Sequence, residues 1–166
     1  HLAIWKQFLK SGEERILVLE DDAVPSPDSA SEMVCRVLAA TPPDADMLLL
    51  GCTIMDGLAA PTDSPMFTRV FYYNGTYAYL LTRKGCQTLL PLMLPLQTHV
   101  DNQISLALVE NSRNLRVYCS EPRMFTHDFA VRSDVYVPVS DEARADRTLA
   151  AIFSRSRAKL IAEGLH

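Results

Sequence analysis

The sequence of 166 residues lacks any run of about 18 apolar residues, the length that a bilayer-spanning helix needs. No signal peptide opens the sequence, and no internal repeat or low-complexity segment interrupts it. It also has no Cys-x-x-Cys pair and no Cys/His run at the spacing of a zinc site. We therefore expect no transmembrane segment and no structural zinc, and the four cysteines are interpreted as mostly buried thiols, with two disulfides as the alternative.

An excess of positive charge is also missing, since 16 Lys and Arg stand against 20 Asp and Glu, a formal net charge of -4. The arginine-containing segments 113–123 and 144–159 are interspersed with acids or apolar residues, the pattern of a solvated helix face or a local anion site. Nucleic acid is therefore not an expected partner. With 48% hydrophobic and 22% charged residues, the composition is globular, and the length fits one domain over residues 1–166.

Short buried strands alternate with amphipathic helices along the chain, which predicts an α/β domain. Asn74-Gly75 is a turn signal that predicts a hairpin, and the hairpin makes the sheet mixed. The expected helices cover residues 1–10, 28–40, 82–93, 100–110 and 141–163, and the expected strands cover 15–20, 47–50, 66–73, 76–81 and 115–119.

One stretch, RILVLEDDAVPSPD from Arg15 to Asp28, runs a buried strand straight into three carboxylates. Crowding like charges destabilises a fold unless a cation, a proton or hydrogen-bond donors compensate. Ligands of open α/β sheets bind at the carboxyl ends of strands, where Glu20, Asp21 and Asp22 would lie. If the strand persists through the acids, Glu20 and Asp22 share one face. Such oxygens suit Mg²⁺ or Mn²⁺, although a solvated acidic turn stays open as a purely structural interpretation.

A phosphoacceptor receiver domain is a further interpretation, because ILVLEDD and DADMLLLGCTIMDG resemble two strands of that family. The position of the phosphorylated aspartate holds Gly51 or Cys52, neither of which can form an acyl phosphate. An apolar helix also precedes the acidic strand, where receivers begin. A receiver-like signalling domain is therefore the least favoured alternative.

Several short elements follow one another along the chain. They are His1 with Trp5, the stretch RILVLEDDAVPSPD, Met47 to Gly51, the segment NGTYAYLL from Asn74 with Lys84-Gly85 and Leu89-Leu90, His99-Val100-Asp101, and Arg132-Ser133-Asp134-Val135. Their order and spacing resemble glycosyltransferase family 25, the lipooligosaccharide and procollagen galactosyltransferases. In this resemblance His1 with Trp5 is similar to the Ser-His helix of that family, and RILVLEDDAVPSPD is similar to its metal-binding acidic strand.

This resemblance implies a GT-A-like fold and inverting transfer of a sugar, galactose or glucose, from a UDP-sugar to a glycan or to hydroxylysine of a collagen-like acceptor. It implies Mn²⁺ or Mg²⁺ on Glu20 and Asp22, with Asp21 toward the ribose or sugar. His127 is a candidate further metal ligand or diphosphate contact, with an ordinary polar loop residue as the alternative. The compartment stays open between the cytoplasm and the lumen of the endoplasmic reticulum.

Inversion needs a base for the acceptor hydroxyl, and Asp101 is the candidate because it opens a helix near the ligand end of the sheet. Its alternative role is a helix N-terminal acid favoured by the macrodipole. Asp134 is a candidate contact to acceptor or metal, or else a turn cap. Tyr77 and Tyr79 either stack on the sugar or face the core, and Tyr79 is the candidate for contact with the donor.

The chain departs from the family in lacking the strand, helix and strand that precede the Ser-His helix, so the expected fold is N-terminally truncated. With no first strand to hold the uracil, we expect weak binding of UDP-sugar. We also expect an exposed sheet edge or apolar surface where those strands would pack, near Ile16, Val18 and Trp5, and with it a possible oligomer. The alternative function is a non-catalytic domain of the same fold that binds a sugar nucleotide or a protein.

Overall fold

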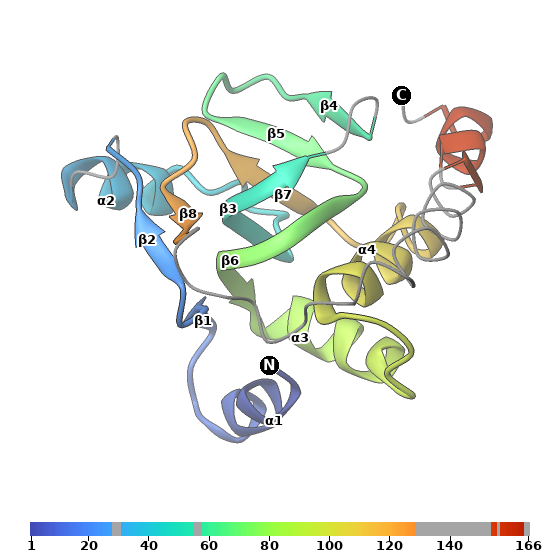
Figure 1. Ribbon diagram of the computed structural model, residues 1–166, viewed down its shortest axis with the longest axis horizontal. Coiled ribbons are helices and arrows are strands. Elements are labelled where there is room, and N and C mark those ends of the chain that lie inside the picture. The colour runs from blue at the N-terminus through green and yellow to red at the C-terminus, as the bar shows by residue number, and fades with distance from the viewer. Residues whose placement is uncertain (28–30, 55–57, 129–153, 156, 165–166) are drawn as a thin grey trace.

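The computed structural model describes residues 1–27, 31–54, 58–128, 154–155 and 157–164. At its centre is a mixed six-stranded sheet in the order β1-β6-β3-β7-β5-β4, and a separate ribbon pairs β2 with β8 (Figure 1). Helices flank the large sheet, so the predicted α/β class with a mixed sheet is confirmed. The strands are β1 (Arg15–Leu19), β2 (Ala23–Pro25), β3 (Met47–Ile54), β4 (Ala59–Pro61), β5 (Phe67–Val70), β6 (Tyr73–Thr82), β7 (Val117–Ser120) and β8 (Phe125–His127).

Strands β1, β3 and β7 run in the same direction. Both β1 and β3 pair antiparallel with β6, which lies between them, and β3 pairs in parallel with β7. Their carboxyl ends therefore meet at one edge of the sheet, together with the start of β6. This is the edge at which ligands of open α/β sheets bind.

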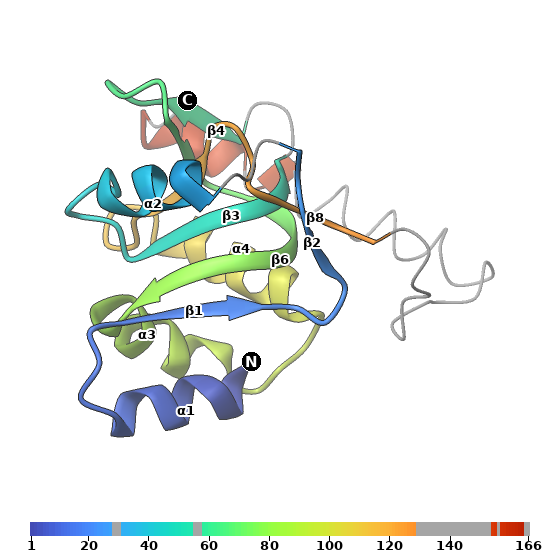
Figure 2. The ribbon, with the colours of Figure 1, turned by 90° about the vertical axis from the view of Figure 1, so that its left-hand side faces the viewer.

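The two faces of the sheet bury alternate residues of each strand, as the period of two requires. Met47 and Leu49 of β3 pack in one core with α1 (Leu2–Lys10), α3 (Arg83–Leu89), the 3-10 turn η1 (Leu90–Met93) and α4 (Val100–Glu110). Leu48 and Leu50 pack in a second core with α2 (Ser31–Ala39). Figure 2 shows α2 on one side of the strands and α1 and α3 on the other.

Helix α1 forms where the apolar spacing predicts it, and its residues Trp5 and Phe8 are buried. Arg83, at the start of α3, holds the loop that follows α1. Its guanidinium donates to the carbonyls of Leu9, Ser11 and Glu13, at 3.1 Å to Leu9. The loop that leads into β1 is thus fixed to the first turn of α3.

The predicted hairpin is wrong. Strand β5 pairs with β4 and β7 rather than with β6, and Asn74-Gly75 lies inside β6 instead of at a chain reversal. Gly75 does adopt the left-handed φ of +71° that makes Asn-Gly a turn signal. Here the glycine accommodates an irregularity in the β3–β6 ladder, whose register shifts between Gly51 and Thr53. The dipeptide therefore signals positive φ without a reversal of direction.

The acidic strand is shorter than predicted. Strand β1 ends at Leu19, and the next residues form a turn closed by a hydrogen bond from the Ala23 amide to the Glu20 carbonyl at 3.1 Å. The strand does not persist through the acids, so the condition under which Glu20 and Asp22 would share a strand face is not met. A turn at this point lets the chain leave the large sheet and enter β2.

The remaining helix predictions agree closely with the structure where it describes them. Helix α4 covers the predicted residues 100–110, and the Thr82 hydroxyl caps α3 by accepting from the Gly85 amide at 3.0 Å. Of the expected C-terminal helix, residues 154–155 and 157–162 are helical, and the residues before 154 lie outside the described part of the chain.

Apolar side chains are exposed near β1, but they are not the ones that the sequence predicts. Trp5 and Val18 are buried at 0% and 5% exposure, because both pack in the core between the large sheet and the helices on that face. Leu17 and Leu19, on the opposite face of the edge strand β1, are instead 45% and 51% exposed. Among the described residues, no helix has the length and apolar character to cross a membrane.

Candidate functional site

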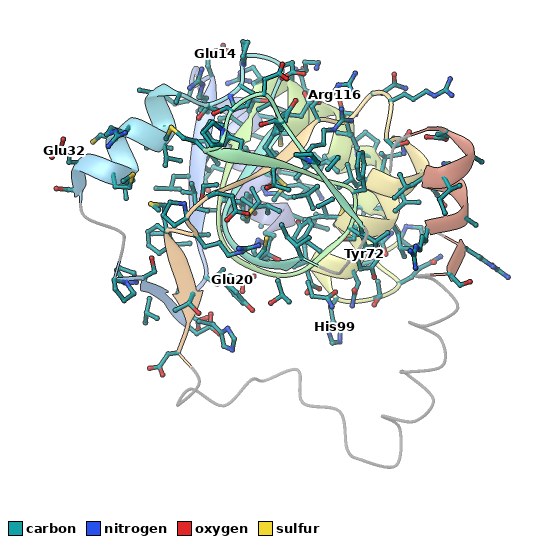
Figure 3. The ribbon with its side chains drawn as sticks, turned by 90° about the horizontal axis from the view of Figure 1, so that it is seen from above. Glu14, Glu20, Glu32, Tyr72, His99 and Arg116 are labelled. Carbon is teal, nitrogen blue, oxygen red and sulfur yellow. The ribbon has the colours of Figure 1, made fainter. Side chains whose placement is uncertain are left out.

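Polar side chains gather where β1, β3 and β7 end. Figure 3 shows Glu20 and His99 on one side of the molecule and Glu14 and Arg116 on the opposite side. Glu14 precedes β1 and Glu20 follows it, so the two acids mark the two ends of that strand. The candidate site therefore lies at the end of the sheet where we expect ligands.

Glu20 is held at this edge by backbone and side-chain contacts. Its amide donates to the Tyr77 carbonyl at 2.9 Å, and its Oε1 lies 3.2 Å from His1 Nε2. Burial raises the pKa of Glu20 above its ordinary value of 4.5, and the nearby carboxylates of Asp101 and Asp21 raise it further. The carboxylates of Asp101 and Asp21 are therefore close enough to Glu20 to disfavour its ionised form.

A chain of polar contacts leads from Glu20 into the core. His1 Nδ1 lies 2.9 Å from the Tyr79 hydroxyl, which also accepts a hydrogen bond from Trp5 Nε1 at 2.9 Å. The Tyr79 ring is fully buried and meets Trp5 edge to face, which matches the core role weighed for it. Its predicted contact with the donor would thus have to run through His1.

Asp22 lies in the turn after β1, beside the small ribbon. Its carbonyl accepts from the Asp128 amide at 2.8 Å, which fastens the turn to the residue that follows β8. Its Oδ1 is buried and has no hydrogen-bond partner. Asp21, between Glu20 and Asp22, is exposed. Buried carboxylate oxygens normally accept a hydrogen bond. The unsatisfied Oδ1 of Asp22 is therefore the most unusual feature of the site.

His127 reaches the site on β8. It pairs with Ala23, the residue after Asp22, across the β2–β8 ribbon. Its ring packs against Tyr77 with centroids 4.7 Å apart. Strand β8 approaches β3 closely at Gly51, where any side-chain Cβ would collide with the Phe125 carbonyl. A residue without a side chain in β3 therefore permits the approach that brings His127 to this edge.

Asp101, in the first turn of α4, faces the start of β6. Its Oδ2 accepts from the Gly75 amide at 2.8 Å and its Oδ1 from the Asn102 amide at 2.7 Å. Asp101 is therefore an acid in the first turn of a helix, as the alternative role holds. It also makes a long-range contact that holds Gly75 in its left-handed conformation. Both oxygens keep lone pairs beyond these bonds, and Asp101 also influences the charge of Glu20.

The structure places Asp21 and Asp101 near Glu20, while Asp22 and His127 are held beside the β2–β8 ribbon by backbone contacts. Glu20, Asp22, Asp101 and His127 lie at one edge, while Asp134 falls outside the described residues. In the described ranges, no three or more His, Cys, Asp or Glu side chains form a ready set of metal ligands.

His1 and Tyr77 contact the predicted site residues, although the sequence assigns neither of them a metal-binding or catalytic role. His1 lies 78 residues from its partner Tyr79, and Tyr77 packs against His127 from β6. His1 and Trp5 are one helical turn apart, and this spacing is the sequence signal that places both side chains on the same face of the helix, where they reach Tyr79.

Comparison with models of known protein families finds no match for this chain, and comparison with curated proteins finds none either. The chemistry of the site is therefore what bears on function.

Proposed function

We propose that this chain is a metal-dependent, inverting glycosyltransferase domain of GT-A-like fold that uses a UDP-sugar, with galactose or glucose as the sugar. The observation that carries the proposal is the buried Oδ1 of Asp22, which has no hydrogen-bond partner at the carboxyl end of β1. An unsatisfied buried carboxylate oxygen costs free energy, and a bound cation would remove that cost.

The residues present fit Mn²⁺ or Mg²⁺. Both ions prefer oxygen ligands, and Mg²⁺ commonly takes one or two carboxylates with substrate phosphates and water completing the shell, so a protein cage of three ligands is not required. Asp22 and Glu20 would hold the ion, with His127 as a candidate third contact from β8. When bound, the ion would stabilise the charge of the departing diphosphate.

The remaining steps are assigned to side chains of the chain itself. Asp101 would take the proton from the acceptor hydroxyl as that oxygen attacks the sugar, since its carboxylate is fixed by two backbone amides. Asp21, the exposed acid of the turn, would contact the ribose or sugar. Asp134 stays a candidate contact to the acceptor or metal. The acceptor itself, a glycan or a collagen-like chain, is an expectation from the family resemblance.

Glu20 gives the site a dependence on protonation. Burial and the neighbouring acids favour its protonated form, while His1 lies within ion-pairing distance of its carboxylate. Below the pKa of Glu20 a cation would have to displace a proton, because a carboxylate ligates only when ionised. Metal binding is therefore expected to strengthen as the pH rises through the pKa of Glu20.

One observation favours the alternative of a non-catalytic domain that binds another protein. Leu17 and Leu19 lie exposed on β1, which pairs with β6 on one side only. An open strand edge with apolar side chains is a common docking surface for another chain. The two functions differ in whether UDP is released.

The decisive experiment measures UDP release from UDP-galactose and UDP-glucose with Mn²⁺, with Mg²⁺ and with a chelator, using water or added sugars as acceptors. We expect release with the metals, none with the chelator, and loss of release in Asp22→Asn. Asp63→Asn is the matched control, since Asp63 is an exposed acid between β4 and β5. Binding of UDP-sugar without release under any condition would favour the non-catalytic alternative.

A further inference from the structure

Two buried cysteines lie side by side in neighbouring strands beneath the candidate site. Cys52 of β3 and Cys119 of β7 have their sulfur atoms 3.5 Å apart, and they are 4% and 0% exposed. The other two cysteines lie elsewhere: Cys35 is exposed on α2, and Cys86 of α3 is a hydrogen-bond donor to the Trp5 carbonyl. Among the cysteines that the structure describes, Cys52 and Cys119 are thus the two whose sulfur atoms lie close together.

The strand geometry explains how these residues meet. Leu49 of β3 is the register partner of Cys119, and β3 shifts register on either side of Gly51. The irregularity, in the ladder with β6, puts Cys52 on the same face of the sheet as Leu49, so its side chain enters the same core as Cys119. A disulfide requires the sulfurs to approach to about 2.05 Å, so rotation of the side chains would have to close a gap of roughly 1.5 Å.

We propose that Cys52 and Cys119 are a disulfide-forming pair, oxidised by exchange with a small disulfide such as oxidised glutathione. One cysteine thiolate attacks the glutathione disulfide, forms a mixed disulfide and releases one glutathione thiolate. The second cysteine thiolate attacks the protein sulfur of that mixed disulfide and releases the other. Two protein thiols are thereby oxidised, glutathione disulfide is reduced to two thiols, and the protons pass to the departing glutathione.

The bond would join β3 to β7 directly below the edge that carries the site. The hydrogen bond with Cys52, and burial, raise the pKa of the Cys119 thiol, so its thiolate is scarce in the folded protein. Arg123 and Glu121, which also influence Cys119, oppose one another in charge. Exchange is therefore slow in the folded chain and fastest when the strands open or while the chain folds.

The experiment equilibrates the Cys35→Ser protein with graded ratios of oxidised to reduced glutathione, including refolding from denaturant at each ratio. Free thiols are alkylated after acid quenching and unfolding, and the protein is analysed by intact mass and peptide mapping. Removing Cys35, the exposed cysteine of the folded chain, prevents links between folded molecules through that thiol. We expect a species lighter by two hydrogen atoms, with two fewer alkylated thiols and a linked pair of peptides that contain Cys52 and Cys119.

Matched variants show which sulfurs are involved. Cys86→Ser should keep the link, whereas Cys119→Ser and Cys52→Ala should each lose it. Two variants of the pair are used so that a folding defect in one does not decide the result. Alkylation of both Cys52 and Cys119 at the most oxidising ratio, or a link that includes Cys86, would overturn the proposal.

Discussion

Replacing Asp101 by asparagine separates the structural role of this residue from its proposed catalytic role. The carboxylate accepts one amide hydrogen bond on each oxygen, from Gly75 and from Asn102. An asparagine of the same shape has only one side-chain oxygen. Its NH₂ group would therefore face a backbone N–H, and one of the two bonds would be lost.

The magnitude follows from these two contacts. Loss of a hydrogen bond to a charged group costs about 1.5–3 kcal/mol. Loss of a negative charge in the first turn of a helix costs about 0.3–1 kcal/mol more. The free energy of unfolding should therefore fall by roughly 2–4 kcal/mol, which for a chain of this size lowers Tm by about 4–16 °C.

Stability is measured by urea denaturation followed by circular dichroism, and turnover is measured well below the lowered Tm. If Asp101 is the base, turnover falls by about a hundredfold or more while affinity for the UDP-sugar changes little. Glu110→Gln is the control, because Glu110 is an exposed acid at the other end of α4. It should leave both quantities nearly unchanged.

Three outcomes would refute parts of this reasoning. An unchanged free energy of unfolding would show that the Asp101 carboxylate does not hold both amides. Unchanged turnover in the folded variant would remove Asp101 as the base. A loss of donor affinity in parallel with turnover would make it a donor-binding residue instead.

Other substitutions probe the surroundings of the site. Tyr79→Phe leaves the buried Nε1 of Trp5 without its acceptor and should cost about 1–3 kcal/mol in urea denaturation; an unchanged midpoint would mean that the indole finds another partner. Glu20→Gln should raise Tm at pH 7, because the raised pKa of Glu20 means that its ionised form destabilises the fold; the gain should vanish below about pH 4.5, and a gain that persists there would contradict the assignment. Gly51→Ala should destabilise by about 1–3 kcal/mol and displace β8, since its Cβ meets the Phe125 carbonyl; normal stability with normal metal binding would show that β8 does not depend on this approach.

The sequence predicts the helices better than the strand pairing, because helix signals are local. The amphipathic spacing of Trp5 and Phe8 and the cap at Thr82 act within one or two turns, and they agree with the structure. The position of β5 depends on β4 and β7, which lie far from it in the chain or are only a few residues long. No local pattern distinguishes that arrangement from a hairpin.

The site shows the same division between local and distant signals. The acids after β1 and at the start of α4 can be predicted because an acid at a strand or helix terminus is visible in the sequence. The contacts of His1 with Glu20 and Tyr79, and of Tyr77 with His127, join separate elements and emerge only once β6 lies beside β1. The unsatisfied Oδ1 of Asp22 likewise depends on burial, which only the folded chain creates.

The most direct test of the metal site is a calorimetric titration of Mn²⁺ and UDP into the wild-type protein, Asp22→Asn and the control Asp63→Asn. The wild type and the control should bind UDP only when Mn²⁺ is present, and Asp22→Asn should lose Mn²⁺ binding while its circular dichroism spectrum stays unchanged. Equal affinity for Mn²⁺ and UDP in a folded Asp22→Asn protein would contradict the assignment of the acidic turn as the metal and diphosphate site.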